Sequence, residues 1–399
     1  MYVRRVIMFK SVPDEILQRY LKFQTSPGNI AKGSISFLMT YFEEEYLKNK
    51  NLLSFPLHVV MKISNQCNMG CLHCSQKSVF RNESEIYMKK WKQVIDKIVC
   101  EGGINVSITG GEPLLHPQIK AIIQYCKKKN LMVSVLTNGS LVDNDMGEFL
   151  GKHLDSTTDV VKLSVDDVGS EYKKIRQGGD FLKIKETISI LKKNKVPVQV
   201  SMVVHNQNYK HIYDVYMFCV ENKVDYIRYV PLFVHENTEL RNALDRDILF
   251  EFDKVLKHNA RYKDYTVIVS DPLSSVFPLL SWIKINKPDM IEDITIGKYI
   301  CPAGVVSVEV DTEGNIYPCS YLNMDDFIIG NILDEGIKKT WKNNLKWNKI
   351  RERYIDNIYC KKCNQLLNCL GGCPASSYYK HGKIGGGDAS CFLCVQGNN

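Results

Sequence analysis

The sequence predicts an α/β protein built as a partial barrel of six strand–helix units, followed by a smaller cysteine-rich domain. Two observations carry this prediction. Strand-like apolar runs alternate with helix-like segments from Phe55 to about Arg241, which is the pattern of a parallel sheet. From Cys301 onward the composition changes to cysteine, glycine and short strand-like segments, which indicates a second domain.

The strands are expected where short apolar runs occur, and the helices where longer amphipathic segments separate them. The expected strands are 57–63, 104–109, 131–136, 161–165, 198–204 and 226–230, and the expected helices are 87–100, 118–129, 144–151, 181–193 and 209–221. The first strand, LHVVMKI, is expected to be buried on both faces. Six such units leave a TIM-like barrel open on one side, where a large substrate such as a peptide or a protein loop can enter.

Four segments are expected along the chain. They are an N-terminal helical cap (1–54), the barrel (55–243), a helical bridge (244–297) and the cysteine-rich domain (298–399). Two helical patterns, at 13–23 and 34–46, make up the cap. The bridge contains an amphipathic stretch, 245–258, and three prolines.

Composition indicates a cytoplasmic globular protein. Of the 399 residues, 44% are hydrophobic and 24% are charged, and the longest apolar runs have strand length, so no membrane span is expected. The first residues are broken by charge and proline before a signal peptide could form. Solvated lysine faces explain most of the net charge of +8; an acidic electron donor or an acidic peptide could also use it.

Fourteen cysteines gathered into short-spaced groups favour metal binding over disulfides. Cys100, Cys126 and Cys219 fall outside the groups and are expected to be buried thiols in helices. The first group, Cys67, Cys71 and Cys74, has the spacing CxxxCxxC directly after the first strand. Three thiolates on one loop can hold three irons of a 4Fe-4S cluster and leave the fourth open to a small molecule.

This loop, followed by Gly110-Gly111-Glu112-Pro113 after the second strand, resembles the radical S-adenosylmethionine (SAM) superfamily. The resemblance implies that the open iron binds SAM and that one electron cleaves it to a 5′-deoxyadenosyl radical, which takes a hydrogen atom from the substrate. The two glycines would let the backbone approach a ligand closely, and Glu112 would meet the methionyl ammonium. Taken alone, this segment reads as a strand-ending turn.

Further positions match the family's cofactor contacts. The resemblance implies a polar turn beside SAM after the third strand, a serine and an acid near the ribose after the fourth, an arginine at the SAM carboxylate and a side chain packed on the adenine. These positions are, in that order, Thr137 and Asn138, Ser164 and Asp166, Arg176, and His73. For Arg176 the alternative is a solvated loop arginine.

The second cysteine group resembles the SPASM extension, which carries two auxiliary iron–sulfur clusters. The resemblance implies an outer cluster on Cys360, Cys363, Cys369 and Cys391, and an inner cluster on Cys301, Cys319 and Cys373. The inner cluster then lacks a fourth cysteine, so that its last iron is open or Cys394 fills the place. The cofactors expected are SAM and three 4Fe-4S clusters; a zinc ribbon is the alternative for the CxxC pairs.

SPASM proteins mostly modify peptides, so the resemblance implies an oxidative peptide maturase that makes a thioether, a carbon–carbon bond or an aldehyde. The expected partners are a peptide or protein substrate, a flavodoxin- or ferredoxin-type electron donor and a separate leader-binding protein, with no nucleic acid and no membrane.

Three alternatives remain open. One is oxidation of a porphyrin propionate, as in haem-pathway decarboxylases, and another is a non-catalytic zinc-ribbon binding module. The third, a sulfatase maturase, is weakened because Ser320 stands where those enzymes have an acid after the inner-cluster cysteine. Tyr321, Asp325 and Asp326 are candidate replacement bases.

Overall fold

The computed structural model describes residues 53–74, 88–233, 240–261 apart from 244, 268–270, 301–353 and 357–388 apart from 364 and 365, with the single positions 13–15, 18, 287 and 289. The helical patterns expected at 13–23 and 34–46 therefore lie outside the described residues, except for four of these single positions. Within the described part of the chain, no helix is both long and apolar enough to cross a membrane.

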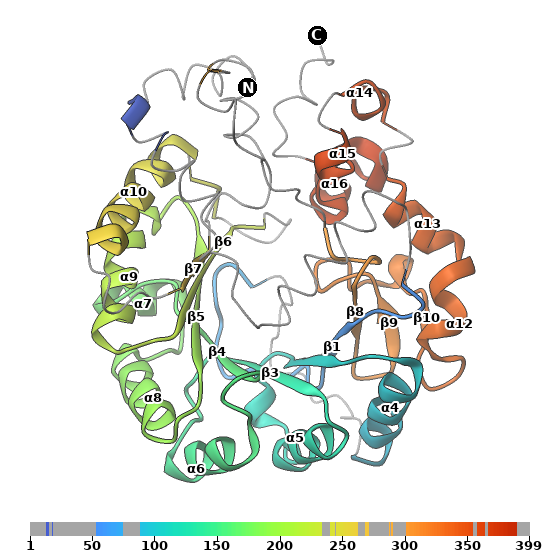
Figure 1. Ribbon diagram of the computed structural model, residues 1–399, viewed down its shortest axis with the longest axis horizontal. Helices are drawn as coiled ribbons and strands as arrows, with labels where there is room; N and C mark the ends of the chain where they lie inside the picture. Colours follow the sequence, from blue (N-terminus) through green and yellow to red (C-terminus); the bar gives the residue numbers. More distant parts are fainter. Residues whose placement is uncertain are drawn as a thin grey trace.

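One curved ten-stranded sheet organises the described chain (Figure 1). Its order is β10-β9-β8-β1-β2-β3-β4-β5-β6-β7, and the run from β8 to β7 is parallel, whereas β9 and β10 are antiparallel. The strands are β1 His58–Lys62, β2 Asn105–Thr109, β3 Met132–Thr137, β4 Val160–Ser164, β5 Val198–Val204, β6 Tyr226–Pro231, β7 Ile268–Ser270, β8 Ser307–Val310, β9 Asn315–Tyr317 and β10 Gly330–Asn331. The predicted partial barrel is confirmed, with each of the six expected strands in place.

Helices line the convex side of this sheet (Figure 1). Those between the barrel strands are α4 Met88–Glu101, α5 Ile119–Lys128, α6 Asn144–His153, α7 Gly169–Ile175, α8 Phe181–Lys193, α9 Ile212–Glu221 and α10 Asp245–Arg261, with 3-10 turns η2 Pro113–Leu115 and η3 Tyr209–His211. The cysteine-rich part adds η5 Asp325–Phe327, α12 Gly336–Asn343, α13 Leu345–Arg351, α14 Ile358–Lys361, α15 Leu366–Cys369, α16 Pro374–His381 and η6 Ile384–Gly386.

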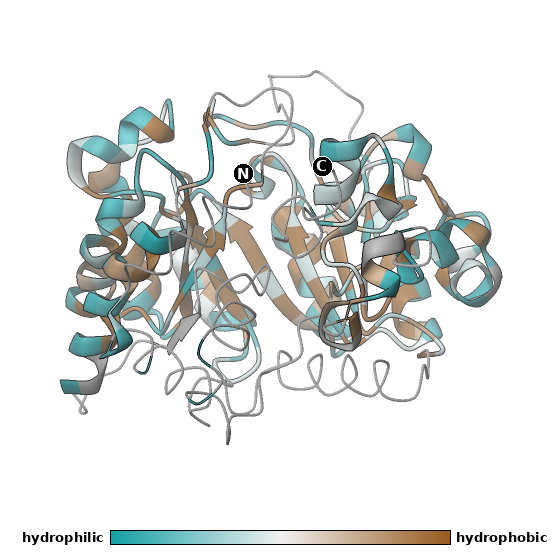
Figure 2. Cartoon of the chain, turned by 90° about the horizontal axis from the view of Figure 1, so that it is seen from above, coloured by the Kyte–Doolittle hydropathy of each residue, from teal (hydrophilic) through white to brown (hydrophobic). Residues whose placement is uncertain are grey.

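Burial alternates along the first strand, so the expectation that it is buried on both faces is wrong. Val59 and Met61 are fully buried towards the helices, whereas His58, Val60 and Lys62, which alternate with them, are only partly buried. In a barrel that does not close, helices cover the convex side of the strands only. Figure 2 shows the apolar strands between the more polar outer helices.

The cysteine-rich part continues the barrel sheet instead of starting a new one. Strand β8 pairs with β1 in register, His58 opposite Ser307, and the main apolar core includes Val308, Trp341 and Trp347 along with the barrel residues. The bridge expected to be helical holds α10 but also strand β7, which pairs with β6. Sequence reasoning missed β7 because its three residues are too short to show a period.

The three cysteines outside the two groups lie in helices, as expected. Cys126 and Cys219 are buried, but Cys100 is exposed, so the expectation of a buried thiol is wrong there. Cys100 lies near the end of α4, on the side away from the buried stripe formed by Trp91, Val94, Ile95 and Ile98.

Candidate active site

The loop 64–74 leaves the carboxyl end of β1, the edge of a parallel sheet where α/β enzymes place their chemistry. It carries Cys67, which is buried, and Cys71 and Cys74, which are half-buried. Two backbone hydrogen bonds hold this loop on the segment 175–177: Gly70 N donates to the Gln177 carbonyl at 2.9 Å, and Leu72 N to the Ile175 carbonyl at 3.0 Å. The positions of the three thiols are therefore fixed by backbone contacts.

Gly110 and Gly111 allow a close approach to the chain's own cysteine loop. A Cβ on Gly110 would lie 2.4 Å from the Ser64 carbonyl oxygen, and one on Gly111 would lie 2.2 Å from that of Gln66 and 2.9 Å from the Cys67 Cβ. Gly111 N also donates to the Ser64 carbonyl at 2.8 Å. The pair of glycines lets the cysteine loop lie directly on the end of β2.

Glu112 is a buried carboxylate that the chain's own donors hold in place. Its Oε1 accepts from the Thr137 hydroxyl at 2.6 Å and from Leu114 N at 3.1 Å, and its Oε2 accepts from Asn138 N at 2.7 Å. Burial raises the pKa of Glu112, against the lowering effect of these hydrogen bonds and of Arg176. A carboxylate accepts about four hydrogen bonds, so about one place is left for an ammonium. The predicted set Glu112, Thr137 and Asn138 is thus brought together, beside the buried Pro113.

Asn138 joins this carboxylate to the cysteine loop. Its Nδ2 donates to the side-chain Oδ1 of Asn68 at 2.8 Å, and Asn68 Nδ2 in turn donates to the Ser140 hydroxyl at 2.9 Å. The ends of β2 and β3 therefore both contact the loop that carries the thiols.

Asp166 and Arg176, predicted to contact different parts of SAM, form an ion pair with each other. Arg176 Nε lies 2.7 Å from Asp166 Oδ2, and His73 Nε2 lies 3.4 Å from the same oxygen. Burial alone would raise the pKa of Asp166, but Arg176 and His73 more than offset it and lower the pKa. Arg176 Nη1 also lies 3.6 Å from Cys71 Sγ. Asp166 and Arg176 therefore lie against the cysteine loop, which carries His73. The roles of these three residues towards SAM stay predictions.

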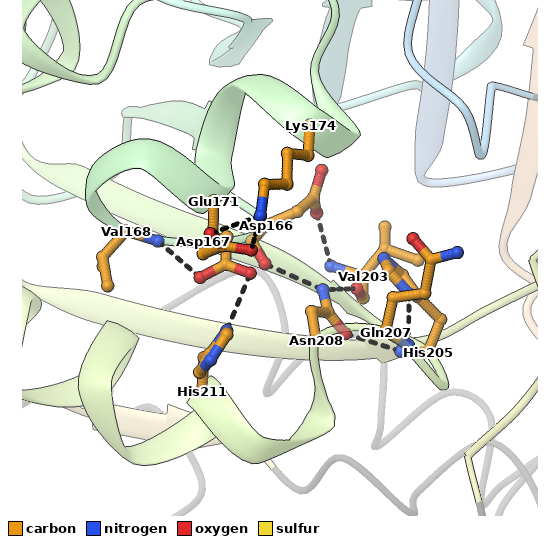
Figure 3. Close-up of polar contacts among 10 residues, drawn as sticks. All are labelled: Asp166, Asp167, Val168, Glu171, Lys174, Val203, His205, Gln207, Asn208 and His211. Atoms are coloured by element: carbon orange, nitrogen blue, oxygen red, sulfur yellow. Dashed lines mark hydrogen bonds and ion pairs between the residues drawn. The ribbon is translucent and has the colours of Figure 1, made fainter.

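The end of β5 and the loop that follows it hold Asp166 in place through hydrogen bonds (Figure 3). Asp166 Oδ1 accepts from Val203 N at 2.7 Å, and the buried Asn208 donates from its Nδ2 to the carbonyl oxygens of Asp166 and Val203, both at 2.8 Å. The Asn208 Oδ1 accepts from His205 N at 2.8 Å. The carboxyl ends of β4 and β5 are thereby locked together. Ser164, which ends β4, pairs with Ser201 of β5.

His205 is a candidate site residue that the sequence reasoning missed. It follows β5 directly, is fully buried, and burial lowers its pKa to about 4 although Asp166 acts in the opposite direction. Its imidazole is therefore neutral at pH 7. The neighbouring Asp167 contacts a different histidine: its Oδ2 lies 2.8 Å from His211 Nδ1 (Figure 3). The sequence signal that could have identified His205 was its position directly after the fifth strand, because α/β barrels place site residues at the carboxyl ends of strands.

The inner-cluster cysteines are gathered by the fold from distant parts of the sequence. Cys301, Cys319 and Cys373 share one apolar cluster with Tyr317 and Leu322. Burial raises the pKa of Cys373 to about 12, and the neighbouring Cys301 adds to this effect. Cys319 precedes the turn at Leu322, and Cys373 is the N-cap of α16, where its sulfur accepts from Ser376 N at 3.4 Å. The predicted inner trio is thus brought together.

The outer-cluster cysteines are only partly described. Cys360 lies in α14 and is buried, Cys363 follows that helix and Cys369 ends α15. Cys391 and Cys394 lie outside the described residues, so the choice between an open iron and Cys394 stays a prediction.

Tyr321 links the cysteine-rich part to the barrel. Its ring stacks on Phe233, just beyond β6, with centroids 4.1 Å apart and planes at 24°. Burial raises the pKa of Tyr321 to about 12, against the effect of Arg228 on β6. Asp325 and Asp326 begin the 3-10 turn η5 and are exposed.

Glu309 on β8 is a second residue that the sequence reasoning missed. Its side chain is 1% exposed and accepts hydrogen bonds from the Ser320 hydroxyl and the Asn323 amide, in the turn after Cys319. Burial raises its pKa. A carboxyl group therefore lies in contact with Ser320, the residue at which the sequence lacks an acid. The only sequence signal was a charge inside the apolar run SVEV.

The donor sets fit iron–sulfur clusters by their chemistry. No disulfide joins any of the twelve cysteines that the structure describes. Burial raises the pKa of Cys71 to about 11, so the metal-free thiol is protonated and iron binding would release its proton. Among the described residues, no three His, Cys, Asp or Glu side chains converge closely enough to hold a single metal ion.

Two family models match the chain. The Radical SAM superfamily matches residues 61–219, which include the three cysteines of the first loop, and the SPASM iron–sulfur cluster-binding domain matches residues 301–364.

Among curated proteins, the antilisterial bacteriocin subtilosin biosynthesis protein AlbA of Bacillus subtilis is 25% identical over 81% of this chain and 68% of its own length. The mycofactocin maturase MftC of Mycobacterium tuberculosis is 23% identical over 87% and 85%, and a cysteine-type anaerobic sulfatase-maturating enzyme of Clostridium perfringens is 25% identical over 80% and 89%.

Solved structures share the fold. Streptococcus suis SuiB bound to the precursor peptide SuiA superposes with a TM-score of 0.72 at 20% identity, covering 90% of this chain and 80% of SuiB. The protein anSMEcpe with bound AdoMet and a Cp18Cys peptide gives 0.62 at 22% identity, covering 85% and 94%. The cysteine loop, the partial barrel and the two family matches together show that this chain is an enzyme of the radical SAM superfamily with a SPASM iron–sulfur domain.

Proposed function

We propose that this enzyme cleaves SAM reductively and abstracts a hydrogen atom from a peptide, installing an oxidative change such as a thioether or a carbon–carbon crosslink. One observation carries the proposal. The cysteine loop leaves the carboxyl end of β1, whereas Cys319 follows β9, which runs antiparallel to β8 and so points to the opposite edge of the sheet. The inner face of the barrel lies between the two thiol groups.

The residues of the chain would position the reactants. With an iron–sulfur cluster and SAM bound at the first loop, the site supplies a 5′-deoxyadenosyl radical. Glu112, held by three protein donors, orients the SAM ammonium with its remaining acceptor position. The Asp166–Arg176 pair keeps a buried guanidinium beside Cys71. A peptide on the inner face would have its reacting carbon close to the radical.

Three 4Fe-4S clusters are the proposed set. The first would be held by Cys67, Cys71 and Cys74, the inner auxiliary cluster by Cys301, Cys319 and Cys373, and the outer one by Cys360, Cys363, Cys369 and Cys391. The thiols of each of the first two trios act on one another electrostatically, which supports these two ligand sets. A flavodoxin- or ferredoxin-type protein would deliver the electron.

A peptide substrate is supported by what the similar proteins are named for. AlbA is a bacteriocin biosynthesis protein, MftC is a maturase, and SuiB has been solved with its precursor peptide SuiA. A separate leader-binding protein would assist recognition.

Cleavage of SAM tests the proposal. Anaerobically reconstituted and reduced enzyme should form 5′-deoxyadenosine, and serine replacement of Cys67, Cys71 and Cys74 should abolish it. Replacing Cys360 and Cys363 should leave SAM cleavage but stop modification of the peptide encoded beside the gene, followed by mass spectrometry. A colourless protein that binds zinc and forms no 5′-deoxyadenosine would overturn the proposal in favour of a binding module.

One observation favours a second candidate, sulfatase-type oxidation of a cysteine or serine side chain. That reaction needs a base near the inner cluster, and Glu309 is a buried carboxyl group in contact with Ser320. A sulfatase-derived peptide should then be converted to its aldehyde by the native enzyme and not by a Glu309→Gln variant.

A further inference from the structure

Two cations on the inner face of the barrel have no acidic ion-pair partner among the residues that the structure describes. The inner face is defined by strand alternation, since neighbours in a strand point to opposite sides. On β4, Val161 and Leu163 are fully buried towards the helices, so Lys162 between them points inward. On β6, Ile227 and Tyr229 are each 1% exposed towards the helices, so Arg228 points inward, where it is exposed.

Lys162 and Arg228 act on each other electrostatically. Burial and the charge of Arg228 lower the pKa of Lys162 to about 8. Neither side chain lies within ion-pair distance of a carboxylate among the described residues. Two cations that repel each other without a carboxylate beside them in the described part of the chain are unfavourable, which is typical of a position built for an anion.

The other titratable groups on this face do not neutralise the pair. His58 on β1 has its Nε2 2.8 Å from the Ser107 hydroxyl, and burial together with Lys162 and Arg228 lowers its pKa to about 3, so it is neutral. Glu309 on β8 is bound by Ser320 and Asn323, and the cation that acts on it is Lys62 of β1.

The position of the pair argues for the substrate rather than for SAM. Lys162 lies two residues before Ser164, which places it about 6–7 Å below the end of β4, whereas the predicted SAM contacts lie at or beyond strand ends. Arg228 also acts on Tyr321, the residue that follows Cys319 by two positions. The pair therefore lies on the part of the inner face between the two thiol groups.

We propose that Lys162 and Arg228 form a carboxylate-binding position that takes an acidic side chain of the peptide substrate. This inference rests on the proposed function and names the class of peptide that the site accepts. Arg228 can bind a carboxylate through two parallel hydrogen bonds, and Lys162 adds a point charge. Peptides with aspartate or glutamate near the modified residue would then be preferred over their amide counterparts.

Synthetic peptides test this preference in the cluster-loaded enzyme with SAM present. A fluorescein-labelled, glycine- and serine-rich peptide with one central glutamate is compared with its glutamine counterpart, both amidated at the carboxyl terminus, by fluorescence anisotropy. The glutamate peptide should bind about tenfold more tightly, which corresponds to one charge-assisted contact. A third peptide has the central glutamine and a free carboxyl terminus. If it binds more tightly than the amidated glutamine peptide, a terminal carboxylate also occupies the site.

Variants locate the effect. Lys162→Met and Arg228→Gln should each reduce the preference for glutamate to about twofold or less, whereas Lys193→Met, at an exposed position of α8, should keep it. Iron content and circular dichroism confirm that each variant is folded. Equal binding of both peptides by the native enzyme, binding of neither, or a preference that survives both substitutions would overturn the inference.

Two further measurements distinguish a peptide carboxylate from the SAM carboxylate, and failure of this inference from failure of the proposed function. If Lys162→Met weakens SAM binding in calorimetry by the same factor as it weakens peptide binding, the bound carboxylate is that of SAM and the inference is wrong. If the native enzyme forms 5′-deoxyadenosine but shows no preference for glutamate, the inference fails and the proposed function stands. If it shows the preference without 5′-deoxyadenosine, the proposed function fails and the anion site stands.

Discussion

At the scale of single residues, the site is defined by buried charges that the chain itself holds. Glu112, Asp166 and Glu309 are each at most 1% exposed, and each accepts hydrogen bonds from side chains or backbone amides that lie far away in the sequence. Burial of an ionised group is unfavourable unless such partners are present. The partners fix where each carboxylate points before any cofactor arrives.

Glu112→Gln tests this at the cofactor site. An amide has one acceptor oxygen, so its NH2 group would face either Asn138 N or the Thr137 hydroxyl and leave a buried donor unsatisfied. We expect a loss of about 1–3 kcal/mol in unfolding free energy and weaker SAM binding, measured by thermal unfolding and calorimetry. Thr137→Ser, which keeps the hydroxyl, is the control. A glutamine variant as stable as the native enzyme would show that these hydrogen bonds are not needed.

Lys162→Met should stabilise the protein at pH 7. The folded state lowers the pKa of Lys162 from 10.5 to about 8, so it binds this proton less well than the unfolded chain does. Stability therefore rises with pH between these two values, and the lysine is unfavourable below about pH 8. Because the side chain is half-buried and partly screened, removing it should add about 1–2 kcal/mol.

The pH dependence of this gain is the diagnostic measurement. Arg228 and His58 are the charged and titratable groups that interact with Lys162, and His58, whose pKa is lowered to about 3, stays neutral between pH 7 and about pH 10. The difference in melting temperature between Lys162→Met and the native enzyme should shrink across that range. A constant difference, or destabilisation at pH 7, would show that Lys162 is not held as an unfavourable cation.

At the scale of elements, the ends of neighbouring strands are tied together rather than left as free loops. The cysteine loop after β1 lies on the end of β2, contacts the loop after β3 and bonds to the segment after α7. Asn208 ties the end of β4 to the end of β5. These links explain how three thiols stay in place on a loop without secondary structure of its own.

Gly111→Ala should disrupt the cysteine loop. The new Cβ would lie 2.2 Å from the Gln66 carbonyl oxygen, a backbone atom that cannot move without shifting Cys67. We expect loss of iron from the first cluster, measured as iron content and absorbance after reconstitution, together with loss of 5′-deoxyadenosine.

Gly70→Ala is the matched control in the same loop. There a Cβ would meet only the Gln177 side chain at an ordinary distance of 3.7 Å, so this variant should keep its iron. If both alanine variants retained iron equally, the close contact between β2 and the cysteine loop would not be what holds the cluster ligands.

At the scale of the whole molecule, the barrel and the SPASM part are one folded unit. Strand β8 completes the sheet beside β1, and Trp341 donates from Nε1 to the Leu53 carbonyl at 2.8 Å. Glu101 at the end of α4 accepts from the backbone amides of Ile337 and Lys338 at the start of α12. The two regions therefore share hydrogen bonds as well as an apolar core.

A chain that ends at residue 300 should not fold as a stable monomer. Removing β8 leaves β1 as an unpaired edge and uncovers apolar side chains that Val308, Val310 and Trp341 now bury. We expect aggregates in size-exclusion chromatography and little retained iron. A monomeric, cluster-bearing truncated protein would show that the barrel is independent of the SPASM part.

The sequence by itself determined the alternation of six strands with helices along the barrel segment, the cysteine groups and the family. Strand length, amphipathic period and cysteine spacing are local properties, and local properties can be read along the chain. They predicted six strands of the barrel and placed Glu112, Thr137 and Asn138 at strand ends that meet.

The tertiary structure alone decided which side chains and strands lie next to one another. It paired Asp166 with Arg176, put Glu309 against Ser320, joined β8 to β1 and left Lys162 and Arg228 together on the inner face. These contacts join residues that are between ten and about 250 positions apart. They depend on strand order, on register and on which side of a strand is left uncovered, and none of these is encoded in a local pattern.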